Sequence, residues 1–485
     1  MSGERKFKGT ITVFLTLSLT IVISLIAAVI ASARDRSMRM RCETAMDLGL
    51  LSVFGEYNRE LLSQFDLYFI DSAYGGQNGS SYYTAERLKD YMQYNLNPAR
   101  GQILPFSRDL FALKADDVDV KMESLATDSG MRVYKRQAIR YVKDRFGMSV
   151  IEGMKKTEKE YKQYRIDEFD PDAERQKELD KMERAGTPED EEGNPVEVEN
   201  PVKKIDDQRA GVIEFLLGEV EVSEKGIDTS SLASNRNLKS GDGIVANTED
   251  LDSVVNNLLF DFYLLDKFQC YTNDLNKKSI DYELEYIING KDNDRKNLSL
   301  VVSAIQAVRY GANAMHALQS EMLKPQAEGA AAVVSAVLLS PELEEPLTNI
   351  ILFAWSFAET CVDVKTLLKG GKVPIMKDDE TWVLKSLPMA LAYKSHLDEG
   401  TSVEKGISYE SYLMLFLMLE GSEKKLKRSV DLIECVLRNS PGNESFRMDN
   451  CIEFLEVEAR VRSRFGREYE IDRYFGYADM PKRDF

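Results

Sequence analysis

The chain has 485 residues, with 81 Asp and Glu against 63 Lys and Arg and a net charge of −18 at neutral pH. This length allows a sizeable core and two or three domains, and the acidic balance argues against binding to nucleic acid. Residues 1–41 hold seven Lys or Arg and two acids, which leaves −23 for the rest of the chain. We therefore expect an acidic body behind a basic N-terminal segment.

The first element is an uncharged stretch, residues 9–33, with basic residues on both sides. As a helix it would extend roughly 37 Å, enough to cross a hydrocarbon layer of about 30 Å. We favour a retained transmembrane helix that anchors a single-pass membrane protein. A cleaved signal peptide stays open, because Ala31 and Ala33 fit the small-residue pattern of a signal-peptidase site, and a buried soluble helix is the third possibility.

The orientation of this span follows from the size of what comes after it. Both flanks are basic, so the positive-inside bias is nearly cancelled. Long domains translocate largely regardless of charge. We therefore expect residues 1–8 to be a cytoplasmic stub and the C-terminal body to be extracellular.

Residues 34–165 are predicted to form a helical stalk and the first part of the ectodomain. From Met46 to Leu61 apolar residues recur at steps of three and four. This periodicity predicts that the first helix continues to about Gln64 and presents an apolar stripe over 46–64 for packing against another element or protein. Further along, the pattern predicts a strand at 66–71, a helix at 84–94, a strand at 118–122 and a helix at 130–164.

Residues 166–204 are dense in charge and poor in apolar side chains. We predict a solvated helix up to Ala185 and then a disordered loop, because such a segment buries too little to offset the entropy of ordering. A calcium site is disfavoured, since the acids lack the spacing of a calcium-binding loop.

Residues 205–485 are predicted to form the main α+β ectodomain of a chain that is predominantly helical. Two apolar stretches are too short to span a membrane and predict a core helical hairpin over 329–364, although two further crossings stay open. Alternation predicts a strand at 282–288 and a C-terminal antiparallel hairpin at 452–461 and 469–477 with a bulge near Phe454. Helices are expected at 298–322, capped by Asn297, and at 409–419 and 423–438, with an extended segment at 372–382.

Candidate catalytic residues are few. Glu359 and Asp363 share a helix face with Trp355, and such a pair could act as an acid and a base or as half of a metal site. We favour a solvated or lysine-paired face near Lys365. The two histidines, His316 and His396, and five scattered cysteines form no known motif. We expect no catalytic residue, no cofactor and no metal site, and therefore no enzyme.

Several motifs carry a resemblance to a known family. They are KGTITVF at 8–14, EYN at 56–58 with DLYFID at 66–71, EYIINGK at 285–291, AWSFAE at 354–359, LLKGGKVP at 367–374 and YESYLMLFL at 409–417. Together they resemble an uncharacterised family of Gram-positive membrane proteins associated with Tad-type pilus gene clusters. The N-terminal region of these proteins is similar to the TadE and TadG pseudopilin-like proteins.

The resemblance implies a non-enzymatic structural or assembly component of a Tad-like, type IV-related pilus or secretion apparatus. It also implies that the stripe over 46–64 contacts other pilus or pseudopilin-like proteins. In prepilins a peptidase cuts after a glycine and a glutamate five residues on is typical, so Gly9–Thr10 would be the processing bond. Here the fifth residue is Phe14, which favours an assembly, priming or anchoring role over that of a major filament subunit. The alternative is a membrane-anchored surface binding, adhesion or sensor protein unrelated to a pilus.

Overall fold

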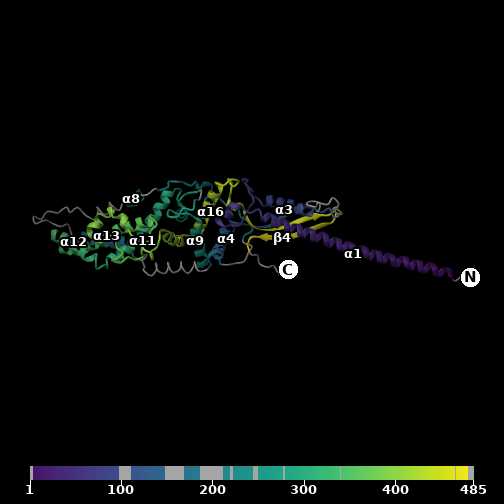
Figure 1. The fold of residues 1–485 in the computed structure, drawn as a ribbon, viewed down its shortest axis with the longest axis horizontal. Helices are drawn as coiled ribbons and strands as arrows, with labels where there is room; N and C mark the ends of the chain where they lie inside the picture. Colours follow the sequence, from purple (N-terminus) through teal and green to yellow (C-terminus); the bar gives the residue numbers. More distant parts are fainter. Residues whose placement is uncertain are drawn as a thin grey trace. The chain divides into compact units, whose positions relative to one another are not determined.

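The computed structural model describes residues 4–97, 111–147, 169–185, 211–218, 222–243, 250–276, 279–338, 340–464 and 466–478. It is 61% helical and has one small antiparallel sheet of four strands, which confirms the predicted α+β class (Figure 1). The predicted disordered loop after Ala185 lies outside the described residues. So does most of the second half of the helix predicted at 130–164.

The chain folds into two units. Unit 1 comprises residues 1–134, 238–248 and 441–485, and unit 2 comprises residues 135–237 and 249–440. Unit 1 contains α1 (Glu4–Phe54), α2 (Arg59–Phe65), α3 (Ser81–Leu96), β1 (Ile70–Asp71), β2 (Lys114–Leu125), β3 (Cys451–Arg462) and β4 (Glu468–Gly476). The chain passes from unit 1 into unit 2 within α4 (Asp128–Phe146), whose regular helix follows a left-handed turn at Ser129–Met131. These two units are defined by contacts between residues in the fold. The boundaries of the predicted segments, at 34–165, 166–204 and 205–485, were defined by the composition of the sequence.

The core of unit 1 is formed by the second half of α1, one face of α3 and one face of the sheet. The buried residues of α1 lie at helical spacing and are Met38, Cys42, Ala45, Met46, Leu50, Val53 and Phe54. The two helices approach closely at Gly49, where an added Cβ would lie 2.8 Å from Leu88 Cδ1. A larger residue at position 49 would therefore displace the side chains of Leu88 and Met92 on α3.

The first helix ends earlier than its periodicity predicts. α1 stops at Phe54, and a turn leads to Asn58, whose side chain accepts a hydrogen bond from Leu61 N (3.0 Å) and caps α2. The prediction of one helix to Gln64 was therefore wrong. The apolar spacing persists across the break because Leu61 and Phe65 of α2 are also buried.

β3 is the central strand of the sheet. β2 pairs along one edge of it, and β4 pairs along the other, with β1 beyond the end of β4 at Cys451 and Ile452. The predicted C-terminal hairpin is confirmed, but its β3–β4 register is continuous from Phe454 to Arg462. The irregularity lies against β2 instead, where Ser124 pairs with Phe454 and Leu125 with Ile452, so the bulge was assigned to the wrong neighbour.

Unit 2 is built from helices. They are α6 (Pro171–Ala185), α8 (Val212–Gly218), α9 (Val254–Lys267), α10 (Glu283–Asn289), α11 (Asp294–Ala317), α12 (Lys324–Val337), α13 (Glu344–Leu368), α14 (Leu387–Leu391), α15 (Tyr409–Leu419) and α16 (Ser422–Arg438). α13 is the central helix and packs against α11, α12 and α6. The predicted helical hairpin is α12 and α13, and α15 and α16 are also confirmed.

Two predictions in this region were wrong. Residues 283–289 form α10 rather than a strand, because Glu283 and Glu285 are buried, so the alternation of charge does not mark an exposed face. The cap of α11 is Asn293 and not Asn297. Asn297 is buried one turn into the helix and exchanges two hydrogen bonds of 2.8 Å with the backbone of Lys291.

Two helices of the described residues are long and apolar enough to cross a membrane, α1 from Ile11 and α13. The apolar part of α1 is not buried at all, whereas 83% of the corresponding window of α13 is buried in unit 2. A core helix passes the same test of length and composition. The structure therefore favours one span and assigns α13 to the core of unit 2.

Candidate functional site

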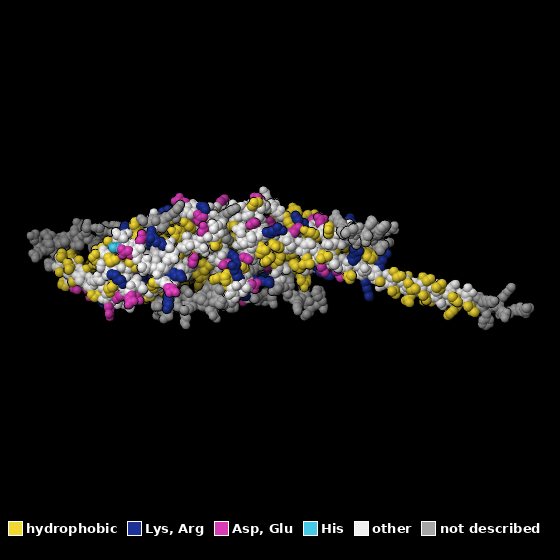
Figure 2. Space-filling view, viewed as in Figure 1, with side chains coloured by type: hydrophobic (Ala, Val, Ile, Leu, Met, Phe, Trp, Pro, Cys, Tyr) yellow, Lys and Arg dark blue, Asp and Glu magenta, His cyan; other side chains and the backbone are white. Residues whose placement is uncertain are grey.

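The apolar half of α1 carries the longest run of exposed large hydrophobic residues in the described part of the chain. Its large side chains from Ile11 to Ile30 are 51–72% exposed, and Figure 2 shows them as a yellow rod. Burying such side chains in hydrocarbon is favourable, and a helix satisfies its own backbone hydrogen bonds there. This segment is therefore compatible with a single membrane span.

The predicted processing bonds lie inside this helix. The helix α1 is unbroken from Glu4 to Phe54 and contains both Gly9–Thr10 and Ala31–Ala33. The side chains of Ala31 and Ala33 are exposed. Cutting at either place requires the helix to unwind locally. Processing at these bonds stays a prediction.

The apolar stripe over 46–64, which we predicted as a surface for partner proteins, is buried within unit 1. Met46, Leu50 and Val53 are at most 2% exposed and pack against α3 and the sheet, and Leu61 of α2 is fully buried. These side chains are therefore unavailable to another protein, which corrects their assignment to the partner surface over 46–64. The exposed apolar residues on the opposite face of α1 are Met40, Leu48 and Leu51.

Adjacent leucines test this assignment. Leu50→Ala should destabilise unit 1 by about 2 kcal/mol, because it leaves a cavity in the core, whereas Leu51→Ala removes a side chain that is 54% exposed and should change little. The buried thiol of Cys42 reports the opening of unit 1. Pulsed thiol labelling of Cys42 should therefore accelerate about 30-fold in the first variant only. Equal labelling in both variants would contradict this packing.

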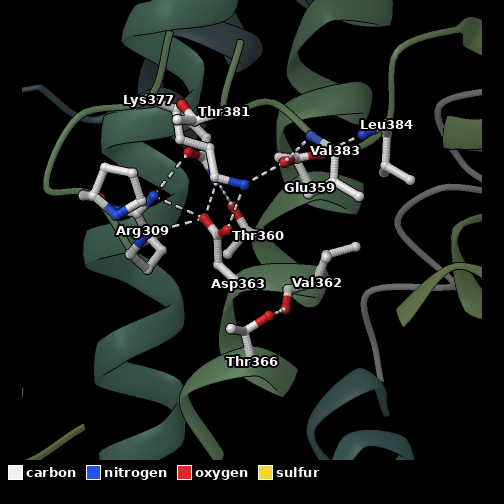
Figure 3. A network of polar contacts seen from close by, with 12 residues as sticks. Arg309, Glu359, Thr360, Val362, Asp363, Thr366, Lys377, Thr381, Val383 and Leu384 are labelled. Atoms are coloured by element: carbon white, nitrogen blue, oxygen red, sulfur yellow. Dashed lines mark hydrogen bonds and ion pairs between the residues drawn. The ribbon is translucent and has the colours of Figure 1, made fainter. Parts of the chain in front are cut away.

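The carboxylates Glu359 and Asp363 lie in a buried charge cluster of unit 2 (Figure 3). Glu359, Asp363, Arg309 of α11 and Lys377 of the loop after α13 are each at most 4% exposed. The Lys377 ammonium points between the two carboxylates. It contacts Glu359 Oε1 and lies 2.6 Å from Asp363 Oδ1. The face is thus lysine-paired, as favoured, but it is buried rather than solvated and its lysine is Lys377 rather than Lys365.

Asp363 is the most heavily bonded member of the cluster. Its Oδ2 accepts hydrogen bonds from Arg309 Nε (3.0 Å), Arg309 Nη2 (2.8 Å) and Asn313 Nδ2 (2.9 Å). Burial alone would raise the pKa of Asp363, but the charges of Lys377 and Arg309 outweigh burial and hold this pKa below its usual value. Asp363 is therefore ionised in the folded protein.

The cluster fastens the loop between α13 and α14. Arg309 Nη1 donates to the carbonyls of Pro374 (2.7 Å) and Ile375 (2.8 Å). Glu359 accepts from the backbone N–H groups of Val383 (2.8 Å) and Leu384 (2.9 Å). All four carboxylate oxygens thus have donors within the chain, and the arrangement supports the conformation of the loop rather than acid–base chemistry.

Other candidate residues are also engaged in local contacts. His316 Nε2 lies 3.0 Å from Asp379 Oδ1, and Ser320 Oγ donates to the same oxygen (2.5 Å). A nucleophilic triad needs the imidazole between the hydroxyl and the carboxylate, and here the carboxylate lies between the other two. His396 contacts Glu399 on the surface. No group of three or more His, Cys, Asp or Glu in the described residues could hold a metal ion.

None of the five cysteines, all of which are among the described residues, forms a disulfide. Cys42, Cys270, Cys361 and Cys451 are buried and Cys435 is partly buried. Burial raises the pKa of Cys42 to about 11 and the pKa values of Cys270 and Cys435 to about 12. Thiols of such high pKa are poor nucleophiles, and these cysteines pack as small apolar residues.

Sequence patterns missed Arg309, Lys377 and Glu285. Arg309 lies on the buried face of α11, four residues after Ile305 and four before Asn313, so a charge at a core position was the available signal. Lys377 lies in a loop without periodicity. Glu285 of α10 is fully buried, with Oε1 accepting from Tyr271 N (3.0 Å) and Tyr409 Oη (2.7 Å) and Oε2 without a hydrogen-bond partner in the described chain.

Comparison with protein families gives a match over residues 191–463, more than half of the chain. This range covers most of unit 2, including the charge cluster, and β3 of unit 1, but not α1. Comparison with curated proteins gave no match, and neither did comparison with solved structures. The chain therefore belongs to the family of unknown function DUF5702.

Proposed function

We propose that the protein is a non-enzymatic structural or assembly component of a Tad-like pilus or secretion apparatus. In this proposal α1 anchors it in the cell membrane, residues 1–8 are cytoplasmic, and the acidic body is extracellular. The resemblance of the N-terminal motif KGTITVF to TadE- and TadG-like proteins supports the assignment to a pilus. The description of the matched family assigns no role.

One observation carries the proposal, namely that the membrane segment and the core of unit 1 belong to the same helix. α1 runs for 51 residues without a break. Its apolar half is exposed and its second half is part of the core of unit 1. A continuous helix is a stiff connection, unlike a Gly- and Ser-rich linker. Such a connection fixes the position of unit 1 relative to the membrane, as a scaffold requires.

The exposed face of α1 offers a surface for other subunits. Met40, Leu48 and Leu51 are 45–64% exposed and continue the line of the apolar membrane segment. Exposed apolar residues on a helix beside a membrane favour association with a second helix. This face replaces the buried stripe as the proposed contact with pilus or pseudopilin-like proteins.

The experiment is deletion of the gene in its host, followed by counting surface pili by electron microscopy. Deletion should abolish pili, and the native gene should restore them. A variant with a short Gly-Ser insertion after Ala33 keeps the span but breaks the stiff connection, so it should remain in the membrane and restore few pili. Normal pili in the deletion strain would contradict the proposal.

A second candidate function, surface binding or adhesion, is favoured by an apolar hollow in unit 2. This hollow measures about 200 Å³ and is lined by Ile288, Asn289, Leu300, Val301, Ala304, Phe416, Leu419 and Glu420. Typical ligand sites measure about 300–1,000 Å³, so it fits a single apolar side chain better than a metabolite. Loss of adhesion with unchanged pili in the deletion strain would support this function instead.

A further inference from the structure

Basic side chains gather where α1 leaves unit 1. Figure 2 shows Lys and Arg in dark blue at this point, next to the apolar rod. We define the basic collar as Arg34, Arg36, Arg39 and Arg41 of α1, Lys114 of β2, and Arg462, Arg464 and Arg467 at the β3–β4 turn. Three segments far apart in the sequence thus bring their cations to one end of unit 1.

Side-chain contacts hold the β3–β4 turn against α1. The Arg467 guanidinium pairs with the Asp35 carboxylate, which also accepts a hydrogen bond from Tyr469 Oη (2.8 Å). The Phe111 ring lies 5.8 Å from the Arg34 guanidinium and 5.7 Å from that of Arg41. The collar is therefore a fixed part of the fold rather than a set of independent surface residues.

The ion pairs of the described residues do not balance the charge of the collar. Within the described ranges, the acids that form ion pairs with the collar are Asp35, Glu43, Asp116 and Glu468. Four carboxylates against eight cations leave the collar at +4, in a chain whose net charge is −18. Arg36, Lys114 and Arg464 are exposed and form no ion pair within the described residues.

With residues 9–33 in the hydrocarbon layer, as proposed above, the collar would lie at the depth of the lipid headgroups. Arg34 directly follows the uncharged stretch 9–33, and Arg41 is seven residues further on, about 10 Å along the helix. Headgroups occupy the several ångströms on each side of the hydrocarbon layer. Cations at this depth are within a Debye length of the lipid phosphates, so their attraction is only partly screened.

We propose that the basic collar binds the phosphate headgroups of anionic phospholipids in the leaflet that faces unit 1. The lipid supplies the negative charge that the collar lacks, and it holds unit 1 against the membrane surface. The inference rests on the proposed membrane span of α1, but it does not depend on which side of the membrane carries the body.

The test uses the full chain in nanodiscs of zwitterionic lipid to which phosphatidylglycerol is added in increasing proportion. Hydrogen exchange of backbone amides over 462–468 and 113–116 is the readout. Phosphatidylglycerol should slow exchange at both segments, and high salt should reverse the effect. Removing the cations Arg36, Lys114 and Arg464 should weaken the response about fivefold for each one removed.

A matched variant controls for general charge. Arg36→Gln, Lys114→Gln and Arg464→Gln together remove three cations of the collar. Arg59→Gln, Lys89→Gln and Lys121→Gln together remove three cations from other parts of unit 1. Only the collar variant should lose the response to phosphatidylglycerol.

Three outcomes would overturn the proposal. Exchange in the native chain could be the same in both lipids, or the two variants could respond equally. Inorganic phosphate added to zwitterionic nanodiscs could slow exchange as phosphatidylglycerol does, which would indicate a site for a free anion. Failure of the anchor itself is distinguishable, because the chain would then not co-purify with the nanodisc.

Discussion

Replacing Asp363 by Asn should lower the free energy of unfolding of unit 2 by about 3–5 kcal/mol. The substitution keeps the size of the side chain but removes the negative charge between Arg309 and Lys377, which are buried beside it. Removing one partner from a buried ion pair leaves an uncompensated charge in a region of low dielectric constant. The loop after α13 should lose its attachment at the same time.

Tryptophan fluorescence measures this effect in unit 2 alone. Both tryptophans of the chain, Trp355 and Trp382, belong to unit 2 and are about 1% exposed. Urea unfolding followed by their fluorescence should show a lower midpoint for Asp363→Asn. Glu345→Gln, an exposed position on the same helix, should leave the midpoint unchanged. Equal midpoints for Asp363→Asn and the native chain would show that the cluster does not stabilise unit 2.

Replacing Glu285 by Gln should stabilise unit 2 on the order of 3 kcal/mol above pH 7 and by much less near pH 4.5. Burial, with a smaller contribution from the nearby Asp294, raises the pKa of Glu285 to about 7, although the hydrogen bonds from Tyr271 N and the Tyr409 hydroxyl lower it. In the unfolded chain the carboxyl has the ordinary pKa of about 4.3. Between these two values the folded state binds more protons than the unfolded state, so the stability of the native chain falls as pH rises.

The glutamine side chain does not titrate, so the stability of the Glu285→Gln variant lacks this dependence on pH. The free-energy difference between the two proteins should therefore grow from about pH 4.5 to about pH 7 and then stay constant. Urea unfolding at a series of pH values, followed by tryptophan fluorescence, measures it. Tyr409→Phe is the control, since the Tyr409 hydroxyl lowers the pKa of Glu285. Loss of this hydroxyl should raise the pH at which the free-energy difference stops growing. Parallel stability curves for the native chain and Glu285→Gln would contradict a protonated Glu285.

Elements with uninterrupted periodicity could be predicted from the sequence. α12, α13, α15 and α16 carry apolar residues at helical spacing, and β3 and β4 alternate between buried and exposed residues over much of their length. In these elements the pattern follows burial, which is the property that periodicity reports. The predictions failed where charged side chains are buried, because the pattern of charge then no longer marks the exposed face.

α10 and the charge cluster illustrate this limit. In α10 the pattern of charge indicated a half-exposed strand, but both glutamates face the interior and are satisfied largely by backbone N–H groups and side-chain hydroxyls. In the cluster the partners of Asp363 and Glu359 lie 54 and 18 residues away, in another helix and in a loop. No local spacing relates such residues, so only the packed structure identifies them.

The central claim is that α1 remains part of the mature protein and holds the body at the membrane. Intact mass and N-terminal sequence of the protein extracted from host membranes test it most directly. We expect a chain that contains 11–33, resists alkaline extraction, and begins at Met1, Ser2 or, after prepilin-type cutting, Thr10. A mature chain that begins at Arg34 and is released from the membrane would contradict the claim.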